Sequence, residues 1–185
     1  MIGNSPYKED IARLFREGLE LGRLHGKTIL VAGATGLVGG CVVDVLMQNP
    51  ARCYKVIAAG RNKERARQKF PAYWEDESFF FAEIDVIQPV IKSIDRMIGE
   101  PVYNELAEGA DYIIDAASNA SPNFFKQNPV EVMKANINGV SNLLEYGLSH
   151  RMQRMVYISS GEIYGEGDGS EFTEKSSGYV DCASV

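Results

Sequence analysis

The glycine-rich run Gly33-Ala34-Thr35-Gly36-Leu37-Val38-Gly39 has the residue types and the spacing to bind an anion. It directly follows the apolar residues 28–32 and precedes an apolar segment of helical periodicity. A strand that ends in such a turn and opens a helix presents unpaired backbone N–H groups and the positive end of the helix dipole to a ligand. We therefore predict that this run binds the pyrophosphate of a dinucleotide.

Each glycine of the run has its own predicted task. Gly33 takes the tight turn, Gly36 lets the phosphate approach the backbone, and Gly39 lets the helix pack closely on the strand. Glycines alone are a weak signal, because a purely structural turn uses the same residues. The strand before the run and the helix after it favour dinucleotide binding, with Thr35, Leu37 and Val38 also placed beside the ligand.

The residues after the second predicted strand bear on the choice of dinucleotide. A carboxylate about 20 positions past the glycines normally accepts hydrogen bonds from the adenosine ribose 2′-hydroxyl. Gly60 and Arg61 stand there instead, and a guanidinium suits a 2′-phosphate. We expect NAD(P), with NADP favoured over NAD, unless Arg61 is simply solvated or stacks on adenine. Further on, Asp85 and Val86 either frame the adenine, or Asp85 caps the turn that leads to Pro89.

The elements that must position these residues follow from hydrophobic periodicity. Short apolar runs alternate with longer segments of helical period, which predicts an α/β fold with a doubly wound parallel sheet of the Rossmann type. Right-handed crossovers then favour the strand order 3-2-1-4-5. Strands are expected at residues 28–32, 55–59, 79–83, 111–116 and 155–159, and helices at 37–49, 62–69, 89–98, 101–108 and 129–149.

Two further segments lie at the ends of the sequence. Residues 1–26 form an N-terminal extension, in which the helical spacing of apolar residues predicts an amphipathic helix over 6–24. We assign residues 27–185 to a truncated dinucleotide-binding Rossmann domain. After Ser160 the sequence becomes rich in glycine and serine, which predicts a loop without a helix or strand.

The composition limits the partners of the chain. Its 185 residues are 45% hydrophobic and carry a formal net charge of -6. This length supports one core, and the acidic balance argues against nucleic acid or an anionic membrane as a partner. Charged residues are scattered through the first 30 positions, so this segment cannot serve as the apolar core of a signal sequence, and we expect a cytoplasmic protein. Three cysteines lack any metal-ligand spacing, which predicts free thiols and no metal site: Cys41, Cys53 and Cys182.

Several motifs together resemble the extended short-chain dehydrogenase/reductase family, the NAD-dependent epimerases and dehydratases of nucleotide-sugar metabolism. The glycine-rich run has the GxxGxxG spacing of this family. Residues 111–118 look like its fourth strand with an Ala-Ala ending, residues 136–140 like the Asn-x-x-Gly-Thr segment of the next helix, and residues 157–165 like its fifth strand and active-site loop. The resemblance implies cofactor contacts from Ala116, Ala117, Ser118 and Asn136, although small residues at a strand end also suit plain packing.

The same resemblance implies roles in the loop after the fifth strand. Ser160 stands where the family places the Ser or Thr that hydrogen-bonds the substrate hydroxyl or carbonyl. Glu162 matches a glutamate that aids proton transfer or positioning in sugar-nucleotide dehydratases and UDP-glucuronate decarboxylases, unless it is a solvated loop carboxylate. Gly161 replaces the aspartate of the dehydratase Asp-Glu pair, which argues against a 4,6-dehydratase mechanism. The Ser/Glu loop, followed by Gly178-Tyr179-Val180-Asp181, is more similar to the decarboxylase branch. Asp115 replaces a histidine of many members, and nothing in the sequence explains this change.

The Tyr-x-x-x-Lys pair of this family is missing, since no tyrosine is followed by a lysine four residues later. In the family this pair supplies the base, and a substrate domain follows it. We therefore expect an N-terminal fragment of a longer nucleotide-sugar epimerase, dehydratase or decarboxylase, without turnover by itself. Members often form homodimers, which the resemblance also implies here. The alternatives are an NADP-dependent reductase of the same family and a non-catalytic dinucleotide-binding module.

Overall fold

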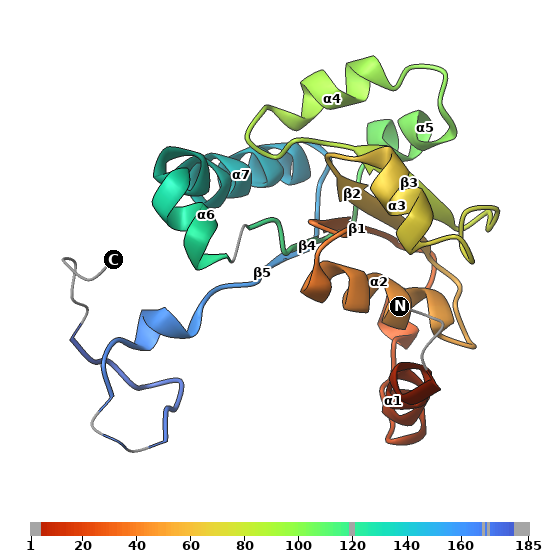
Figure 1. Ribbon diagram of the computed structural model, residues 1–185. Helices are drawn as coiled ribbons and strands as arrows, with labels where there is room; N and C mark the ends of the chain where they lie inside the picture. The colour runs from red at the N-terminus through yellow and green to blue at the C-terminus, as the bar shows by residue number, and fades with distance from the viewer. Residues whose placement is uncertain (1–4, 119–120, 168, 170, 180–185) are drawn as a thin grey trace.

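The computed structural model describes residues 5–118, 121–167, 169 and 171–179 of the chain (Figure 1). Its parallel sheet has the order β3-β2-β1-β4-β5, which confirms the predicted doubly wound topology. All five predicted strands are present, and their ends differ from the predicted ones by at most two residues. The strands are β1 (Thr28–Ala32), β2 (Lys55–Gly60), β3 (Phe79–Glu83), β4 (Tyr112–Asp115) and β5 (Arg154–Tyr157).

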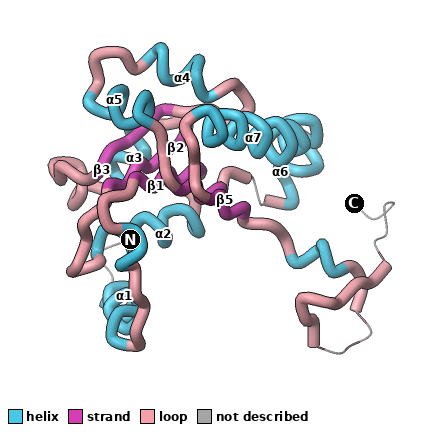
Figure 2. The backbone as a smooth tube through the Cα atoms, turned by 180° about the vertical axis from the view of Figure 1, so that it is seen from behind, coloured by secondary structure: helices cyan, strands magenta, loops and turns pink. Residues whose placement is uncertain are grey.

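Helices cover both faces of the sheet (Figures 1 and 2). Successive side chains of a strand point to opposite faces, so Leu30 joins one core and Val31 joins the other, and both are fully buried. This burial on two faces explains why the strands read as continuous apolar runs. The first core lies under α4 (Val90–Arg96), α5 (Pro101–Glu108) and α7 (Pro129–Ser149), and the second under α2 (Leu37–Gln48) and α3 (Lys63–Lys69).

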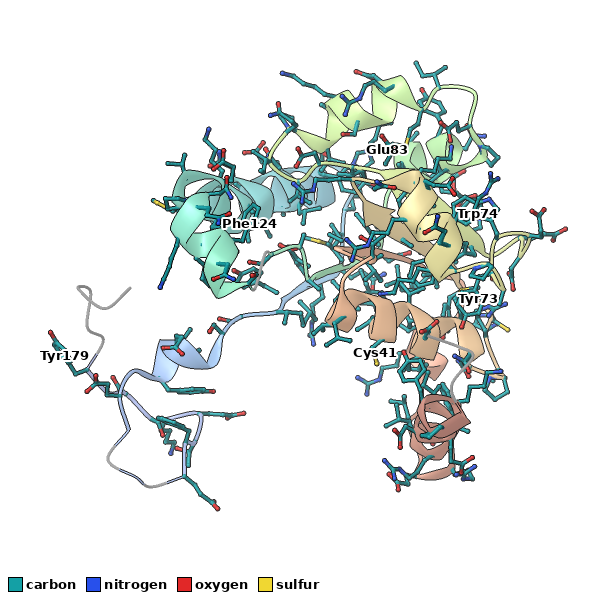
Figure 3. All side chains as sticks on the ribbon, in the orientation of Figure 1. Cys41, Tyr73, Trp74, Glu83, Phe124 and Tyr179 are labelled. Atoms are coloured by element: carbon teal, nitrogen blue, oxygen red, sulfur yellow. The ribbon has the colours of Figure 1, made fainter. Side chains whose placement is uncertain are left out.

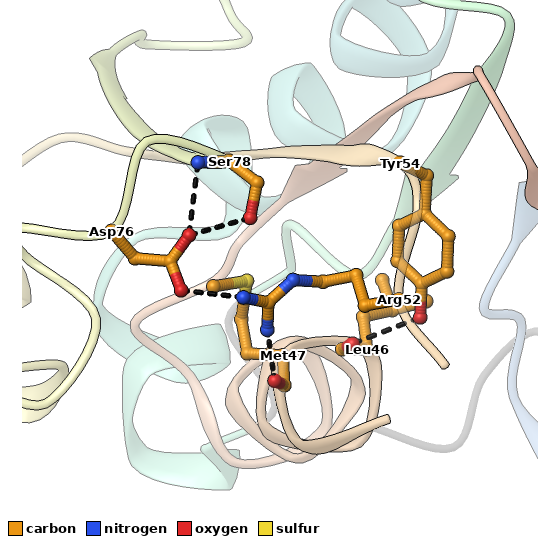
Figure 4. Close-up of polar contacts among 6 residues, drawn as sticks. All are labelled: Leu46, Met47, Arg52, Tyr54, Asp76 and Ser78. Carbon is orange, nitrogen blue, oxygen red and sulfur yellow. Dashed lines mark hydrogen bonds and ion pairs between the residues drawn. The ribbon is translucent and has the colours of Figure 1, made fainter. Parts of the chain in front are cut away.

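A polar brace holds the edge of the sheet at which β2 and β3 begin (Figure 4). The Arg52 guanidinium donates to the Met47 carbonyl near the end of α2 and pairs with Asp76 in the loop before β3. Asp76 also accepts from the Ser78 N–H at 2.9 Å and from the Ser78 hydroxyl at 2.6 Å. Burial raises the pKa of Asp76, but the Ser78 hydrogen bonds and the Arg52 charge outweigh it, so the pKa lies below its ordinary value.

The N-terminal helix is shorter than predicted. Helix α1 (Ser5–Arg16) ends before Gly18, which has a φ of 97°. The Leu19 N–H returns to the Leu14 carbonyl at 2.9 Å and the Gly18 N–H to the Phe15 carbonyl at 3.3 Å, the Schellman ending that a left-handed glycine permits. A separate 3-10 turn, η1 (Gly22–Leu24), follows, so the predicted single helix over 6–24 is wrong.

Two short elements were not predicted. Helix α6 (Pro122–Gln127) is too short for its apolar residues to show a period, although proline commonly occupies the first turn of a helix. The 3-10 helix η2 (Gly161–Tyr164) lies where a loop without helix was predicted, and its first turn is capped by the Ser160 hydroxyl. The segment that carries η2 runs away from the body of the sheet (Figures 1 and 2).

Two isoleucines test the placement of the core. Ile113 in β4 is fully buried, whereas Ile137 on α7 is 61% exposed. We expect Ile113→Ala to lower the free energy of unfolding by about 2–5 kcal/mol, because it leaves a cavity between strand and helix. Ile137→Ala should change it by less than about 0.5 kcal/mol. Urea denaturation measures both, and equal losses would contradict the assignment of Ile113 to the core.

Candidate functional site

A cavity of about 370 Å³ opens beyond the carboxyl ends of the strands. The chain passes from β1 to β2 on one side and later to β4 on the other, so the loops after these strands diverge and leave a crevice between them. Predicted cofactor residues that line this cavity are Gly33, Thr35, Gly36, Leu37, Arg61, Asp85, Val86, Ala116, Ala117 and Ser118. The topology thus gathers four separate sequence segments around one cavity.

Gly33 and Gly39 allow the backbone approaches on which the glycine-rich run is built. Gly33 has a φ of 72°, and a Cβ there would overlap the Ala116 carbonyl and lie 2.8 Å from the Ala117 Cα. A Cβ on Gly39 would lie 2.8 Å from the carbonyl carbon of Gly33, so only glycine lets α2 begin so close to β1. These contacts are the ones that a tight turn and close packing of helix on strand require.

The turn after β4 is held by a buried carboxylate. Asp115 is 2% exposed, and its carboxylate accepts a hydrogen bond from the Ala117 N–H at 3.0 Å. Burial raises the pKa of Asp115, and the bond from Ala117 opposes that rise. The short turn brings the backbone of Ala116 and Ala117 against Gly33. Asp115 therefore has a structural explanation that the sequence did not provide.

The far end of the cavity is lined by residues that follow β2 and β3. Arg61 and Arg65 both line the cavity, and both are exposed. Asn62 fixes this region, because its side chain accepts from the Arg65 N–H at 2.7 Å and caps α3. Asp85 lines the cavity and also accepts from the Ile87 N–H at 3.2 Å, so both predicted roles are compatible with its position.

Arg65 was missed by the sequence analysis. No local signal marked it, because Arg61 lies before α3 begins at Lys63 and the helical four-residue spacing does not relate the two arginines. Phe124 and Glu131 from α6 and α7 also line the cavity and were not predicted. Their contribution depends on how these two helices pack at the cavity mouth, which no local motif encodes.

Other predicted site residues lie outside the cavity lining. Val38 is exposed on α2, Gly39 is buried against Gly33, and Asn136 is half-buried on α7. Ser160 and Glu162 are exposed on the segment that carries η2, and the Glu162 N–H donates to the Ser160 hydroxyl at 3.2 Å. Figure 3 shows Tyr179 at the end of this segment, far from Trp74 and Tyr73.

Some sequence expectations concern metals, thiols and membranes. Within the part of the chain that the structure describes, no three His, Cys, Asp or Glu side chains are placed to hold a metal ion. Cys41 and Cys53 are free thiols, and Cys182 lies outside the described residues, as do Val180 and Asp181. None of the helices in the described ranges combines the length and the apolar character needed to cross a bilayer.

A doubly wound parallel sheet with a glycine-rich turn and a cavity at its switch point defines the Rossmann class of α/β domains. The match to a family model is more specific. Residues 29–182 match the model of the NAD dependent epimerase/dehydratase family, and the chain belongs to this family. This result confirms the family that the sequence motifs resemble.

The curated relatives are longer than this chain. UDP-glucuronic acid decarboxylase 6 of Arabidopsis thaliana is 31% identical over 139 residues, which cover 75% of this chain and 35% of that protein. UDP-glucuronic acid decarboxylase 1 of Xenopus tropicalis is 28% identical and covers 95% of this chain and 39% of its own length. The chain therefore spans little more than a third of the length of these relatives.

Solved structures share the fold. An epimerase from Methanothermobacter thermautotrophicus has a TM-score of 0.61 and 25% identity, and the match covers 90% of this chain and 43% of that one. A double mutant of dTDP-glucose 4,6-dehydratase from Streptomyces venezuelae, solved with NAD bound, has a TM-score of 0.66 and 20% identity. The latter match covers 83% of this chain and 45% of that one.

Two glycines with positive φ test the backbone contact at the cavity. A Cβ on Gly99, with a φ of 90°, would meet nothing within 4 Å, whereas a Cβ on Gly33 would overlap backbone. Gly99→Ala should therefore cost only the left-handed strain of about 1–2 kcal/mol. Gly33→Ala should cost about 1–3 kcal/mol more, because the turn or β4 must move. Urea denaturation compares the two variants, and equal destabilisation would contradict the close approach.

Proposed function

We propose that this chain is the cofactor-binding part of an NAD(P)-dependent nucleotide-sugar epimerase, dehydratase or decarboxylase. The cavity at the switch point carries this proposal, because it joins the glycine-rich run to the ends of β2, β3 and β4 in one concave site. Membership of the epimerase/dehydratase family supports the cofactor class. The UDP-glucuronic acid decarboxylases among the relatives support a nucleotide-sugar as the substrate of the longer protein.

The lining of the cavity fits a dinucleotide along its length. Gly33 and Gly36 offer backbone without side chains, so a pyrophosphate would lie over them at the start of α2. Val86 and Asp85 would frame the adenine, and residues 116–118 would face the nicotinamide end. When bound, the cofactor supplies a temporary acceptor for a hydride from a sugar carbon. The residues of this chain bind it, orient it and shield it from water.

We assign Ser160 and Glu162 to the substrate side of the reaction. Asp115 and Tyr157 are paired in the β4–β5 register, so the residues after Tyr157 leave the sheet at the edge that bears the cavity. A serine hydroxyl there would hydrogen-bond the substrate, and a glutamate would position it or aid a proton transfer, as the similarity to decarboxylases implies. Tyr-x-x-x-Lys is missing from the sequence, so we propose that the chain alone binds the cofactor without turnover.

The charge at the far end of the cavity favours NADP as the cofactor. Two guanidinium groups, those of Arg61 and Arg65, line the cavity there. A guanidinium offers a phosphate charge-assisted hydrogen bonds in a fixed fork, which a ribose diol does not need. Asp85, half-buried in the same lining, would repel a phosphate placed beside it, so the 2′-phosphate is assigned to the Arg61 side.

Titration with NADPH and NADH tests both the site and the cofactor preference. The chain should bind NADPH more tightly, and Arg61→Ala should weaken NADPH binding by about tenfold, the loss expected for one hydrogen bond to a charged group. NADH binding should change by less than about twofold. Arg67→Ala is the matched control, because Arg67 lies 5.1 Å over the Trp74 ring and does not line the cavity.

Two results would contradict these assignments. Equal affinities for NADPH and NADH, with no loss in Arg61→Ala, would remove the 2′-phosphate proposal and leave NAD as the cofactor. Failure of the wild-type chain to bind either dinucleotide would remove the proposed function itself.

A turnover assay tests the proposed inactivity of the chain. The purified chain, mixed with NAD or NADP and UDP-glucuronic acid or UDP-glucose, should accumulate neither reduced nicotinamide nor a changed sugar. The reason is that hydride removal needs a base for the sugar hydroxyl, and no Tyr-x-x-x-Lys pair is present. Absorbance of reduced nicotinamide and chromatography of the sugar nucleotide measure the two products. Repeated turnover would show that another residue serves as the base.

A further inference from the structure

Lys69, the last residue of α3, reaches the glycine-rich run from the side of the sheet that α3 covers. Its ammonium donates to the Thr35 carbonyl at 3.2 Å and also to the Gly36 carbonyl. Both acceptors belong to residues that line the cavity, but Lys69 does not line it. The ammonium thus contacts the predicted pyrophosphate loop without facing the cavity.

Gly40 provides the space for this contact. A Cβ on Gly40 would overlap the Lys69 Nζ and Cε atoms and would lie 3.2 Å from the Ala34 carbonyl oxygen. Gly40 is buried in α2 and lies outside the GxxGxxG spacing, so the phosphate-binding pattern does not explain it. Glycine in a helix costs roughly 0.5–1 kcal/mol relative to alanine. The space that the Lys69 side chain needs beside α2 explains why residue 40 is a glycine.

The groups around the Lys69 ammonium leave the carbonyls of the glycine-rich run as its hydrogen-bond acceptors. Lys69 is half-buried, and burial lowers its pKa, while the nearby Asp44 carboxylate opposes that change. Asp44 is 1% exposed and accepts hydroxyl hydrogen bonds from Tyr7 at 2.8 Å and from Tyr73 at 3.0 Å. Within the described ranges, Lys69 has no carboxylate within 4.0 Å of its nitrogen. Its hydrogen bonds therefore go to backbone carbonyls.

We infer that Lys69 is a positioning residue for the dinucleotide, which orients a peptide group of the run toward the pyrophosphate. The Gly36 carbonyl and the Leu37 N–H belong to one planar peptide group and point in opposite directions. The Gly36 carbonyl also accepts the Gly40 N–H at 3.2 Å, and the ammonium adds a charged donor to it. With the carbonyl held in this way, the Leu37 N–H is directed away from Lys69, and Leu37 lines the cavity. A charge-assisted bond to the carbonyl also polarises the peptide, which makes its N–H a stronger donor.

This inference rests on the proposed dinucleotide site and is tested by titrating the chain with NADPH and NADH. Lys69→Ala should weaken the binding of the preferred dinucleotide by about tenfold, the loss that one charge-assisted hydrogen bond gives. Gly40→Ala should weaken it similarly, because the new methyl group displaces the ammonium. The double variant should bind no more weakly than Lys69→Ala, since no ammonium is left to displace.

Two further measurements separate positioning from a general loss of structure. Lys63→Ala is the matched control, because Lys63 is on the same helix but pairs with Glu100 and does not line the cavity. Its affinity for the dinucleotide should equal that of the wild type. Lys69→Arg, which keeps a cation, should recover part of the binding lost in Lys69→Ala. Thermal unfolding of all variants shows whether they are folded at the titration temperature.

The outcomes are distinguishable. If the wild-type chain binds the dinucleotide and the affinity of Lys69→Ala lies within about twofold of the wild-type affinity, the inference is overturned and the proposed function stays in place. Additive losses in the double variant would also overturn it, because they would show that Gly40 acts independently of Lys69. If the wild-type chain binds no dinucleotide, the proposed function fails, and the inference fails with it.

Discussion

Where β1 and β4 end, two stretches of backbone lie so close that no side chain fits between them. Gly33 lies against Ala116 and Ala117, and the left-handed φ of Gly33 turns the chain into α2 at that point. The spacing of these two loops follows from this contact, because the run after β1 and the turn after β4 form two of the cavity walls. Asp115 stabilises the second wall from within by accepting the Ala117 N–H. This part of the candidate site therefore presents backbone, which suits a ligand recognised through its phosphates.

The parts of this architecture that depend on local pattern were predictable. Buried parallel strands must be apolar on both faces, so all five were predicted to within two residues at either end. Helices α5 and α7 were predicted with the observed bounds, and a proline stands in the first turn of each. The end of α1 was readable in Gly18 but was overlooked in favour of the apolar spacing that continues to Leu21. The glycine-rich run was also predictable, since its three glycines are spaced three residues apart within one short segment.

The parts that depend on contacts between distant segments were not predictable. Lys69 is separated from Gly36 by 33 residues. No periodicity in the sequence links a lysine at the end of α3 to backbone carbonyls at the start of α2. Arg65 reaches the cavity because the Asn62 cap fixes the first turn of α3, which is a three-dimensional effect. Asp115 was noticed only as a departure from a family pattern, and its role became clear from its burial and its bond to Ala117. The roles of such polar residues depend on contacts with residues that are distant in the sequence and become neighbours only in the folded chain.

The hydrogen bond between Tyr7 and Asp44 connects the N-terminal helix to α2, the helix that follows the glycine-rich run. Burial and the Asp44 carboxylate raise the pKa of both Tyr7 and Tyr73, so the two phenols remain protonated donors to one buried acid. A chain that began at residue 27 would keep every strand and the whole glycine-rich run, but Asp44 would lose one of its two hydroxyl partners. A transfer of this Rossmann domain into another protein should therefore carry the first helix together with the sheet.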